Sequence, residues 1–180
     1  MPFDEQDGLA ALKAAIPDYA KDLRLNLPGV FASAHLSEQQ LWGTAVAAAI
    51  AARNPQLRTA VVAAARPHLS EPALTAAKTA AALMGMNNIY YRFTHLVGND
   101  AYRQMPARLR MQALANPGVE RADFELFSLA VSAVNGCGMC IEAHERQLIT
   151  HGVTREGVQD AVRLASVLHA IAVALEAEAA

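Results

Sequence analysis

The chain has 180 residues, of which 53% are hydrophobic and only 6% aromatic, and its formal net charge is −2. This composition excludes a disordered chain, and the presence of only two cysteines excludes a disulfide-dense miniprotein. The small net charge gives no electrostatic reason to expect a nucleic acid or an anionic membrane as a partner. Because the length is close to that of one domain, we expect a single all-helical domain over residues 1–180.

The N-terminal segment and the apolar runs predict a cytoplasmic protein. The first ten residues, MPFDEQDGLA, carry acidic side chains where an export signal needs a basic and then a long apolar run. The alanine-rich runs, such as AVAAAIAA, fall short of the roughly 18 apolar residues that a membrane-spanning helix needs. Cytoplasmic thiols stay reduced unless they serve redox chemistry or bind metal, so Cys137 and Cys140 stand out.

Alanine-rich segments predict an all-α fold, a compact multi-helix bundle. Alanine accounts for 39 residues, and its runs are broken by Pro, Gly and Asn without the period-two alternation of strands. Between Glu5 and Val30 we expect two or three short helices, cut by Pro17 and Pro28. Ser37 and Gln40 form a capping box, which predicts a helix that runs to residue 53.

The remaining elements follow in chain order. Asn54-Pro55 ends the previous helix, and a further short helix runs to about residue 66. Ser70 caps a long helix whose pattern persists to Gly98. A loop at 99–106 is then followed by predicted helices over 107–115, 122–134 and 137–151, and by a last helix that Thr154 caps and that ends near 177. The short connections predict antiparallel or steeply crossed neighbours, including a helical hairpin at about 122–152.

The candidate catalytic side chains lie in this hairpin. If the chain turns at Asn135-Gly136, both sulfurs lie in the first turn of the next helix, where free N–H groups and the helix dipole favour thiolate. Cys137 and Cys140, at i and i+3, share a face and can form a disulfide. His144, four residues after Cys140, stacks one turn below it as a base, and Glu125 on the preceding helix is placed to hold the other imidazole nitrogen.

Two other interpretations of these residues stay open. Cys137, Cys140, His144 and either Glu125 or His151 would supply four zinc ligands, although a second C-x-x-C or a paired histidine is missing. Alternatively, the cysteines are buried and inert, and the histidine is a surface residue. A redox dithiol is the favoured interpretation.

We interpret His151 as a helix C-cap. Core or subunit-interface positions are the interpretation for His169, Trp42 and the cluster Met84, Met86, Tyr90, Tyr91 and Phe93.

The whole chain resembles the alkyl hydroperoxidase D family, the lipoyl-dependent peroxidases of the carboxymuconolactone decarboxylase-like superfamily. The pattern of a glutamate, then C-x-x-C, then a histidine four residues later carries the resemblance. Supporting stretches are DYAKDLRLN (18–26), LWGT (41–44) with RNP (53–55), MGMNNIYYR (84–92), LRM (109–111) with ANPG (115–118), FEL (124–126) and VNGC (134–137). The resemblance implies an all-helical homotrimer with no haem, flavin or metal bound.

The resemblance also implies a reaction. The dithiol would reduce organic hydroperoxides and become a disulfide, which dihydrolipoamide on a 2-oxoacid dehydrogenase component would reduce again. A second implied partner is the peroxiredoxin of the alkyl hydroperoxide reductase system. Cys140 matches the cysteine that becomes a sulfenic acid, Cys137 matches the resolving thiol and proton donor, and His144 and Glu125 match the proton relay.

One position departs from the family pattern. Met139 stands where the best-known members have a histidine, and a thioether cannot exchange protons at neutral pH. We expect the chemistry to survive with an altered rate or pH profile. An electron-transfer adaptor that reduces a peroxiredoxin, with little direct peroxidase activity, is the alternative function. The decarboxylase branch of the superfamily is disfavoured because those enzymes do not need the dithiol.

Overall fold

The computed structural model of the chain describes residues 8–179, and these residues form helices joined by turns and loops, with no strand among them. The predicted all-α class is therefore confirmed. The α-helices are α1 Gly8–Ala15, α2 Lys21–Val30, α3 Glu38–Ala51, α4 Pro55–Ala65, α5 Glu71–Leu96, α6 Ala101–Gln104, α7 Arg121–Val134, α8 Gly138–Thr150 and α9 Arg155–Glu178. Short 3-10 turns lie at Asp18–Ala20, Arg66–His68 and Gln112–Leu114.

Side-chain caps start several helices where the sequence places them. The Ser37 hydroxyl accepts a hydrogen bond from the Gln40 amide at 3.2 Å, and the Gln40 side chain accepts one from the Ser37 amide at 3.0 Å. The side chains of Asn54, Ser70 and Thr154 cap α4, α5 and α9, and each accepts one backbone hydrogen bond. Each cap satisfies a backbone donor that has no partner inside the helix and contributes about 1 kcal/mol.

Two predicted features are wrong. The segment 107–115 is not a helix: it is irregular up to Met111, Arg108 has a positive φ of 52°, and only the 3-10 turn Gln112–Leu114 forms. The segment is too short to be a stable helix without a packed face, and each of its residues is half-buried or exposed. Pro28 lies inside the last turn of α2 rather than ending it. The expected loop at 99–106 contains the single turn α6, and residues 5–7 lie outside the described residues.

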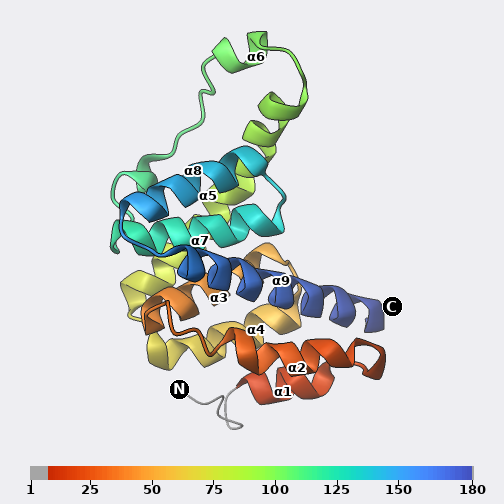
Figure 1. The fold of residues 1–180 in the computed structure, drawn as a ribbon. Coiled ribbons are helices and arrows are strands. Elements are labelled where there is room, and N and C mark those ends of the chain that lie inside the picture. The colour runs from red at the N-terminus through yellow and green to blue at the C-terminus, as the bar shows by residue number, and fades with distance from the viewer. Residues whose placement is uncertain (1–7, 180) are drawn as a thin grey trace.

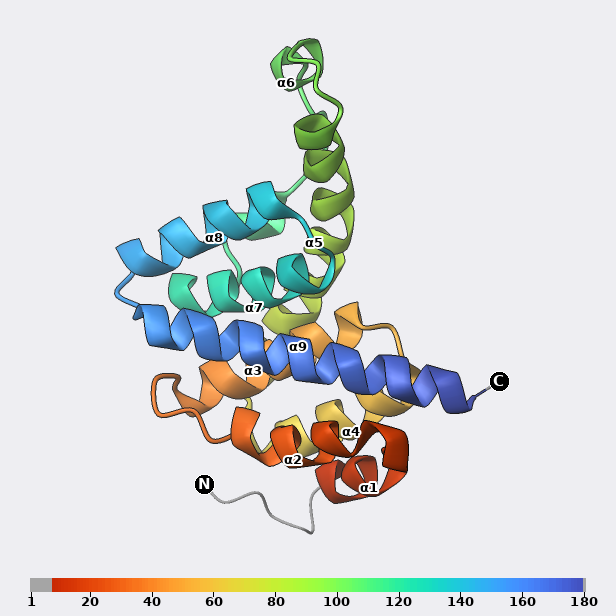
Figure 2. The same cartoon turned by 45° about the vertical axis from the view of Figure 1, so that its right-hand side comes forward.

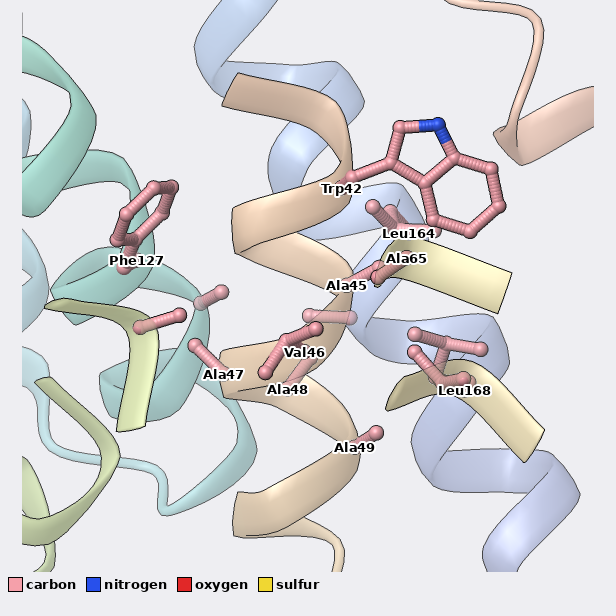
Figure 3. Packing of buried hydrophobic residues seen from close by; sticks show 14 of the residues in the cluster. Trp42, Ala45, Val46, Ala47, Ala48, Ala49, Ala65, Phe127, Leu164 and Leu168 are labelled. Atoms are coloured by element: carbon pink, nitrogen blue, oxygen red, sulfur yellow. The ribbon is translucent and has the colours of Figure 1, made fainter. Parts of the chain in front are cut away.

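Helix α3 forms the centre of the core. Every residue from Leu41 to Ala49 is buried, and α5, α7 and α9 all pack against this helix. Figure 3 places Phe127 of α7 on one side of α3, and Leu164 and Leu168 of α9 on the other. The small alanine side chains let these helices approach closely. Gly43 marks a particularly close approach, because a Cβ atom there would lie 2.2 Å from the ring of Phe127.

Helices α7, α8 and α9 run back and forth as successive antiparallel neighbours, and α9 crosses the body between the α7–α8 pair and the N-terminal helices (Figures 1 and 2). Among residues 8–179, α9 is the helix long and apolar enough to span a membrane, with a mean hydropathy of 1.5 over 18 residues. Half of that stretch is buried inside the protein, against α2, α3 and α7. A core helix meets the same criterion, and α9 occupies that position here.

The outer half of α5 projects from the body and carries α6 at its end (Figures 1 and 2). In the cluster predicted to be core or interface, Met84 is buried and Phe93 is exposed, while Met86, Tyr90 and Tyr91 are half-buried. Trp42 is buried and stacks on His68 with ring centroids 4.5 Å apart. His169 is exposed, so it is not a core residue in this chain.

Candidate active site

The two cysteines meet at the turn between α7 and α8. Gly136, with φ of 67°, reverses the chain after α7, and Cys137 then occupies the N-cap of α8 in an extended conformation. Cys140 falls in the first turn. The two Sγ atoms lie 2.7 Å apart as free thiols, and both residues are buried, Cys137 at 0% exposure and Cys140 at 7%. A disulfide needs about 2.05 Å, so a small shift joins the sulfurs.

The surroundings of Cys140 do not lower its pKa as the helix start predicted. Burial raises it, the hydrogen bond and charge of Cys137 raise it further, and Asn88 opposes them, which leaves the pKa at about 12. Loss of solvation therefore outweighs the favourable end of the helix dipole. Because two sulfurs in contact repel each other as anions, a second ionisation of the pair is strongly disfavoured.

A network of amides lies behind the dithiol. Asn88 of α5 is fully buried, and its Nδ2 donates to the hydroxyl of Ser132 at 2.9 Å while its Oδ1 accepts from Asn135 at 3.0 Å. The carbonyl of Asn135 in turn accepts from Arg92 at 2.5 Å. These partners fix the orientation of the Asn88 carboxamide, whose hydrogen bond to Cys140 favours the thiolate.

His144 and Glu125 form a second pair across the hairpin. Nδ1 of His144 lies 2.6 Å from Oε2 of Glu125, and the other oxygen of Glu125 accepts from Arg121 at 2.6 Å. Burial raises the pKa of Glu125, but the hydrogen bonds and charges of His144 and Arg121 outweigh that effect and lower it below its usual value. Glu125 is therefore ionised and holds the imidazole orientation. The other ring nitrogen, Nε2, lies 3.3 Å from Sδ of Met84.

Beside Cys140 and the His144–Glu125 pair lies a cavity of about 220 Å³. Cys140 and His144 both line it, so a water molecule or a substrate inside can touch both. The rest of its wall comes from α5, α7, α8 and the segment before α7: Met84, Asn87, Tyr91, Leu114, Arg121, Phe124, Glu125, Ser128, Met139 and Ala143. Apart from the ion pair of Arg121 and Glu125, the wall is mainly apolar. The thiol of Cys140, the imidazole of His144, and the neutral polar residues Asn87 and Ser128 border the same small volume.

The structure thus brings together the predicted residues Cys137, Cys140, His144 and Glu125. It leaves His151 exposed at the C-cap of α8. Within residues 8–179, no group of three or more His, Cys, Asp and Glu side chains is arranged to hold a metal ion.

Five residues at the site were not predicted to belong to it: Met84, Asn87, Asn88, Arg121 and Ser128. Helical spacing from Glu125 offered a signal for two of them, because Arg121 precedes it by four residues and Ser128 follows it by three. Adjacent Asn87 and Asn88, inside a long helix rich in apolar residues, offered another. Neutral polar residues inside a helix usually need a partner when they are buried.

A buried dithiol at a helix start lies beside a histidine–glutamate pair in an all-helical fold, and this arrangement is typical of thiol redox proteins. The carboxymuconolactone decarboxylase family model matches residues 100–180. "Alkyl hydroperoxide reductase AhpD" of Rhodospirillum centenum is 60% identical over 96% of this chain and 92% of that protein. The AhpD proteins of Bradyrhizobium sp. and Solibacter usitatus are 60% and 57% identical, over 93% and 95% of this chain and 93% and 97% of theirs. The chain belongs to the AhpD family.

Proposed function

We propose that this protein is a thiol peroxidase that reduces organic hydroperoxides through a dithiol–disulfide cycle of Cys137 and Cys140. The observation that carries the proposal is the 2.7 Å contact between the two sulfurs, one of which lines a cavity shared with His144. The name of the relatives, alkyl hydroperoxide reductase, supports hydroperoxide reduction as the activity. The dithiol has no evident use in a decarboxylase, so that branch of the superfamily is not favoured.

The reaction takes two steps. Nε2 of His144 takes the proton of the Cys140 thiol, and the thiolate attacks the terminal oxygen of the hydroperoxide. The O–O bond breaks, and the alkoxide leaves as the alcohol with a proton from His144 or Cys137. Cys140 is then a sulfenic acid. The Cys137 sulfur displaces the hydroxyl of that sulfenic acid and forms the disulfide, and the hydroxyl leaves as water with the proton that still remains on Cys137 or His144. Glu125 holds Nδ1 of His144 and thereby keeps Nε2 facing the cavity.

The disulfide has to be reduced by another dithiol. Following the family resemblance, we propose dihydrolipoamide on a 2-oxoacid dehydrogenase component as the reductant, and the peroxiredoxin of the alkyl hydroperoxide reductase system as a protein that accepts electrons. We also propose a homotrimer. Its support is a set of large apolar side chains left exposed on the outer part of α5 and on and beside α6: Ile89, Phe93, Leu96, Val97, Tyr102 and Met105.

One observation favours the alternative function, an electron-transfer adaptor with little direct peroxidase activity. A thiol whose pKa is raised to about 12 is a poor nucleophile at neutral pH until its neighbour or a bound substrate removes the proton. Timing the loss of thiols after mixing the reduced protein with a hydroperoxide, or with the oxidised peroxiredoxin, separates the two functions. Faster reaction with the peroxiredoxin by orders of magnitude would support the adaptor.

The residue assignment has its own test. One equivalent of cumene hydroperoxide should take the protein from two free thiols to none. Cys140→Ser should abolish sulfenic acid formation, whereas Cys137→Ser should let the sulfenic acid accumulate, because its resolving partner is gone. Trapping with a sulfenic-acid reagent and mass spectrometry measures both. Peroxide reduction that survives in Cys140→Ser and is lost in Cys137→Ser would reverse the two roles.

A further inference from the structure

Two buried polar atoms in the cavity wall have no hydrogen-bond partner among the described residues. They are Oδ1 of Asn87 and Oγ of Ser128, in side chains that are 5% and 0% exposed. Burying a polar atom without a partner destabilises the fold, so such atoms are rare and need an explanation. When they line a cavity beside a reactive group, the simplest explanation is that a ligand supplies the missing hydrogen bonds.

The helices bring both groups to the same volume as the dithiol. Asn87 lies one turn beyond Met84 on α5, and Ser128 lies one turn beyond Glu125 on α7, so each shares a face with a group that contacts His144. Cys140 and His144 reach the cavity from α8. One acceptor and one hydroxyl therefore share a space of about 220 Å³ with the sulfur.

We propose that Ser128 and Asn87 are the binding site for the –O–OH group of a small alkyl or aralkyl hydroperoxide. The carboxamide oxygen of Asn87 accepts the hydroperoxide O–H, and the Ser128 hydroxyl donates to the alkyl-bearing oxygen. This deepens the proposed function and rests on it. The apolar wall, with Tyr91, Leu114 and Phe124 among its members, takes the hydrocarbon part of the substrate.

These contacts fit the electron flow of the first step. As the sulfur bonds to the terminal oxygen, the O–O bond breaks and its electron pair moves to the alkyl-bearing oxygen. Negative charge therefore develops where Ser128 donates, and a proton from His144 or Cys137 completes the alcohol. A donor that meets developing charge in a buried site stabilises the transition state more than the ground state.

Thr44 provides a matched comparison. Its hydroxyl is also buried without a partner among the described residues, but it lies in α3, within the core, and does not line the cavity. Removing it tests the loss of an unpaired hydroxyl as such. Ser128→Ala, Asn87→Ala and Thr44→Val should all keep the helical circular dichroism of the parent chain.

The experiment measures single-turnover oxidation of the reduced protein by cumene hydroperoxide, and separately its reaction with an aromatic disulfide reagent. We expect Ser128→Ala and Asn87→Ala each to slow the hydroperoxide reaction about tenfold, as for one lost hydrogen bond, with little change towards the disulfide reagent. Thr44→Val should leave both rates unchanged. As a second readout, cumyl alcohol should protect Cys140 from alkylation in the parent chain and not in Ser128→Ala.

Several results would overturn the inference. They are unchanged hydroperoxide rates in both variants, an equal loss in Thr44→Val, an equal loss towards the disulfide reagent, or alcohol protection that persists in Ser128→Ala. Failure of the parent chain to react with the hydroperoxide at all would instead contradict the proposed function. In that case protection by the alcohol still reports on the binding site.

Discussion

Asn88 contributes the interaction that favours the charged form of Cys140. Burial and the neighbouring Cys137 raise the pKa of Cys140 to about 12, whereas the hydrogen bond from Asn88 lowers it. The carboxamide cannot turn away, because Ser132 and Asn135 hold both of its ends. Asn88 is therefore a positioning residue for the thiolate, and its role is separate from any substrate contact with Asn87 or Ser128.

Replacing Asn88 should shift the pH dependence of the reaction. In Asn88→Ala the thiolate loses a hydrogen bond, so the pKa of Cys140 rises further and less thiolate is present at neutral pH. At neutral pH the rate of thiol oxidation by hydroperoxide should fall severalfold. The variant should reach the parent chain's neutral-pH rate only at a higher pH, because its thiolate fraction is smaller at each pH. Rates measured from neutral to alkaline pH, with thiolate absorbance followed in parallel, check this shift.

A control separates this effect from loss of stability. Asn54 is also buried and makes two side-chain hydrogen bonds, to the Leu57 amide and to Glu176, far from the dithiol in the chain and outside the cavity wall. Asn54→Ala should lower the free energy of unfolding by about 1 kcal/mol and leave the pH profile in place. If Asn88→Ala and the parent chain had identical pH profiles, Asn88 would not stabilise the Cys140 thiolate.

At the scale of helices, local signals predict where elements start and packing decides the rest. The capping residues Ser37, Ser70 and Thr154 each act within one turn, so the sequence predicts the helices that follow them. The segment 107–115 has helix-forming residues too, yet Arg108 adopts a positive φ and the helix is absent. Its helical state would need a neighbouring surface to pack against, which no local pattern encodes.

The candidate site also contains residues that local spacing predicts and residues that only helix packing brings in. Cys137, Cys140 and His144 lie within eight residues of one another, so helical periodicity was enough to group them, and Glu125 lies on the preceding helix. Met84 lies 60 residues before His144 and reaches it only because α5 packs against α8. The raised pKa of Cys140 also depends on burial by distant helices, which explains why the helix start alone predicted the wrong direction.

Gly43 tests how closely α3 and α7 are packed. Alanine favours a helix over glycine by about 1 kcal/mol, but a Cβ at Gly43 would lie 2.2 Å from the Phe127 ring. Because Phe127 is completely buried, its ring cannot move without displacing other core residues. We expect Gly43→Ala to destabilise the fold by about 1–3 kcal/mol. Chemical denaturation followed by circular dichroism measures the change.

Gly85 is the matched control for this substitution. It lies inside α5, and a Cβ there would meet nothing within 4 Å. Gly85→Ala should therefore stabilise the fold by about 0.5–1 kcal/mol through helix propensity alone. If both substitutions were stabilising, the contact between α3 and α7 would be looser than the structure indicates.

At the scale of the whole molecule, the outer part of α5 and α6 is an exposed apolar arm. Its side chains include Phe93 at 47% and Leu96 at 71% exposure, and Phe93 packs edge-on against Tyr102 with ring centroids 5.2 Å apart. The arm extends away from the body (Figures 1 and 2). Contiguous exposed apolar side chains usually mark a surface that another protein covers, which supports the proposed homotrimer.

Charges placed on this arm should separate the subunits. We expect the combined change Phe93→Asp and Leu96→Asp to convert a trimer into monomers, because an interface cannot bury unpaired carboxylates without a large loss of free energy. Sedimentation velocity at several protein concentrations measures the assembly. Leu25→Asp, at a similarly exposed leucine on α2, should leave it unchanged. A parent chain that sediments as a monomer would contradict the trimer, and a trimer that persists with both carboxylates would place its interface elsewhere.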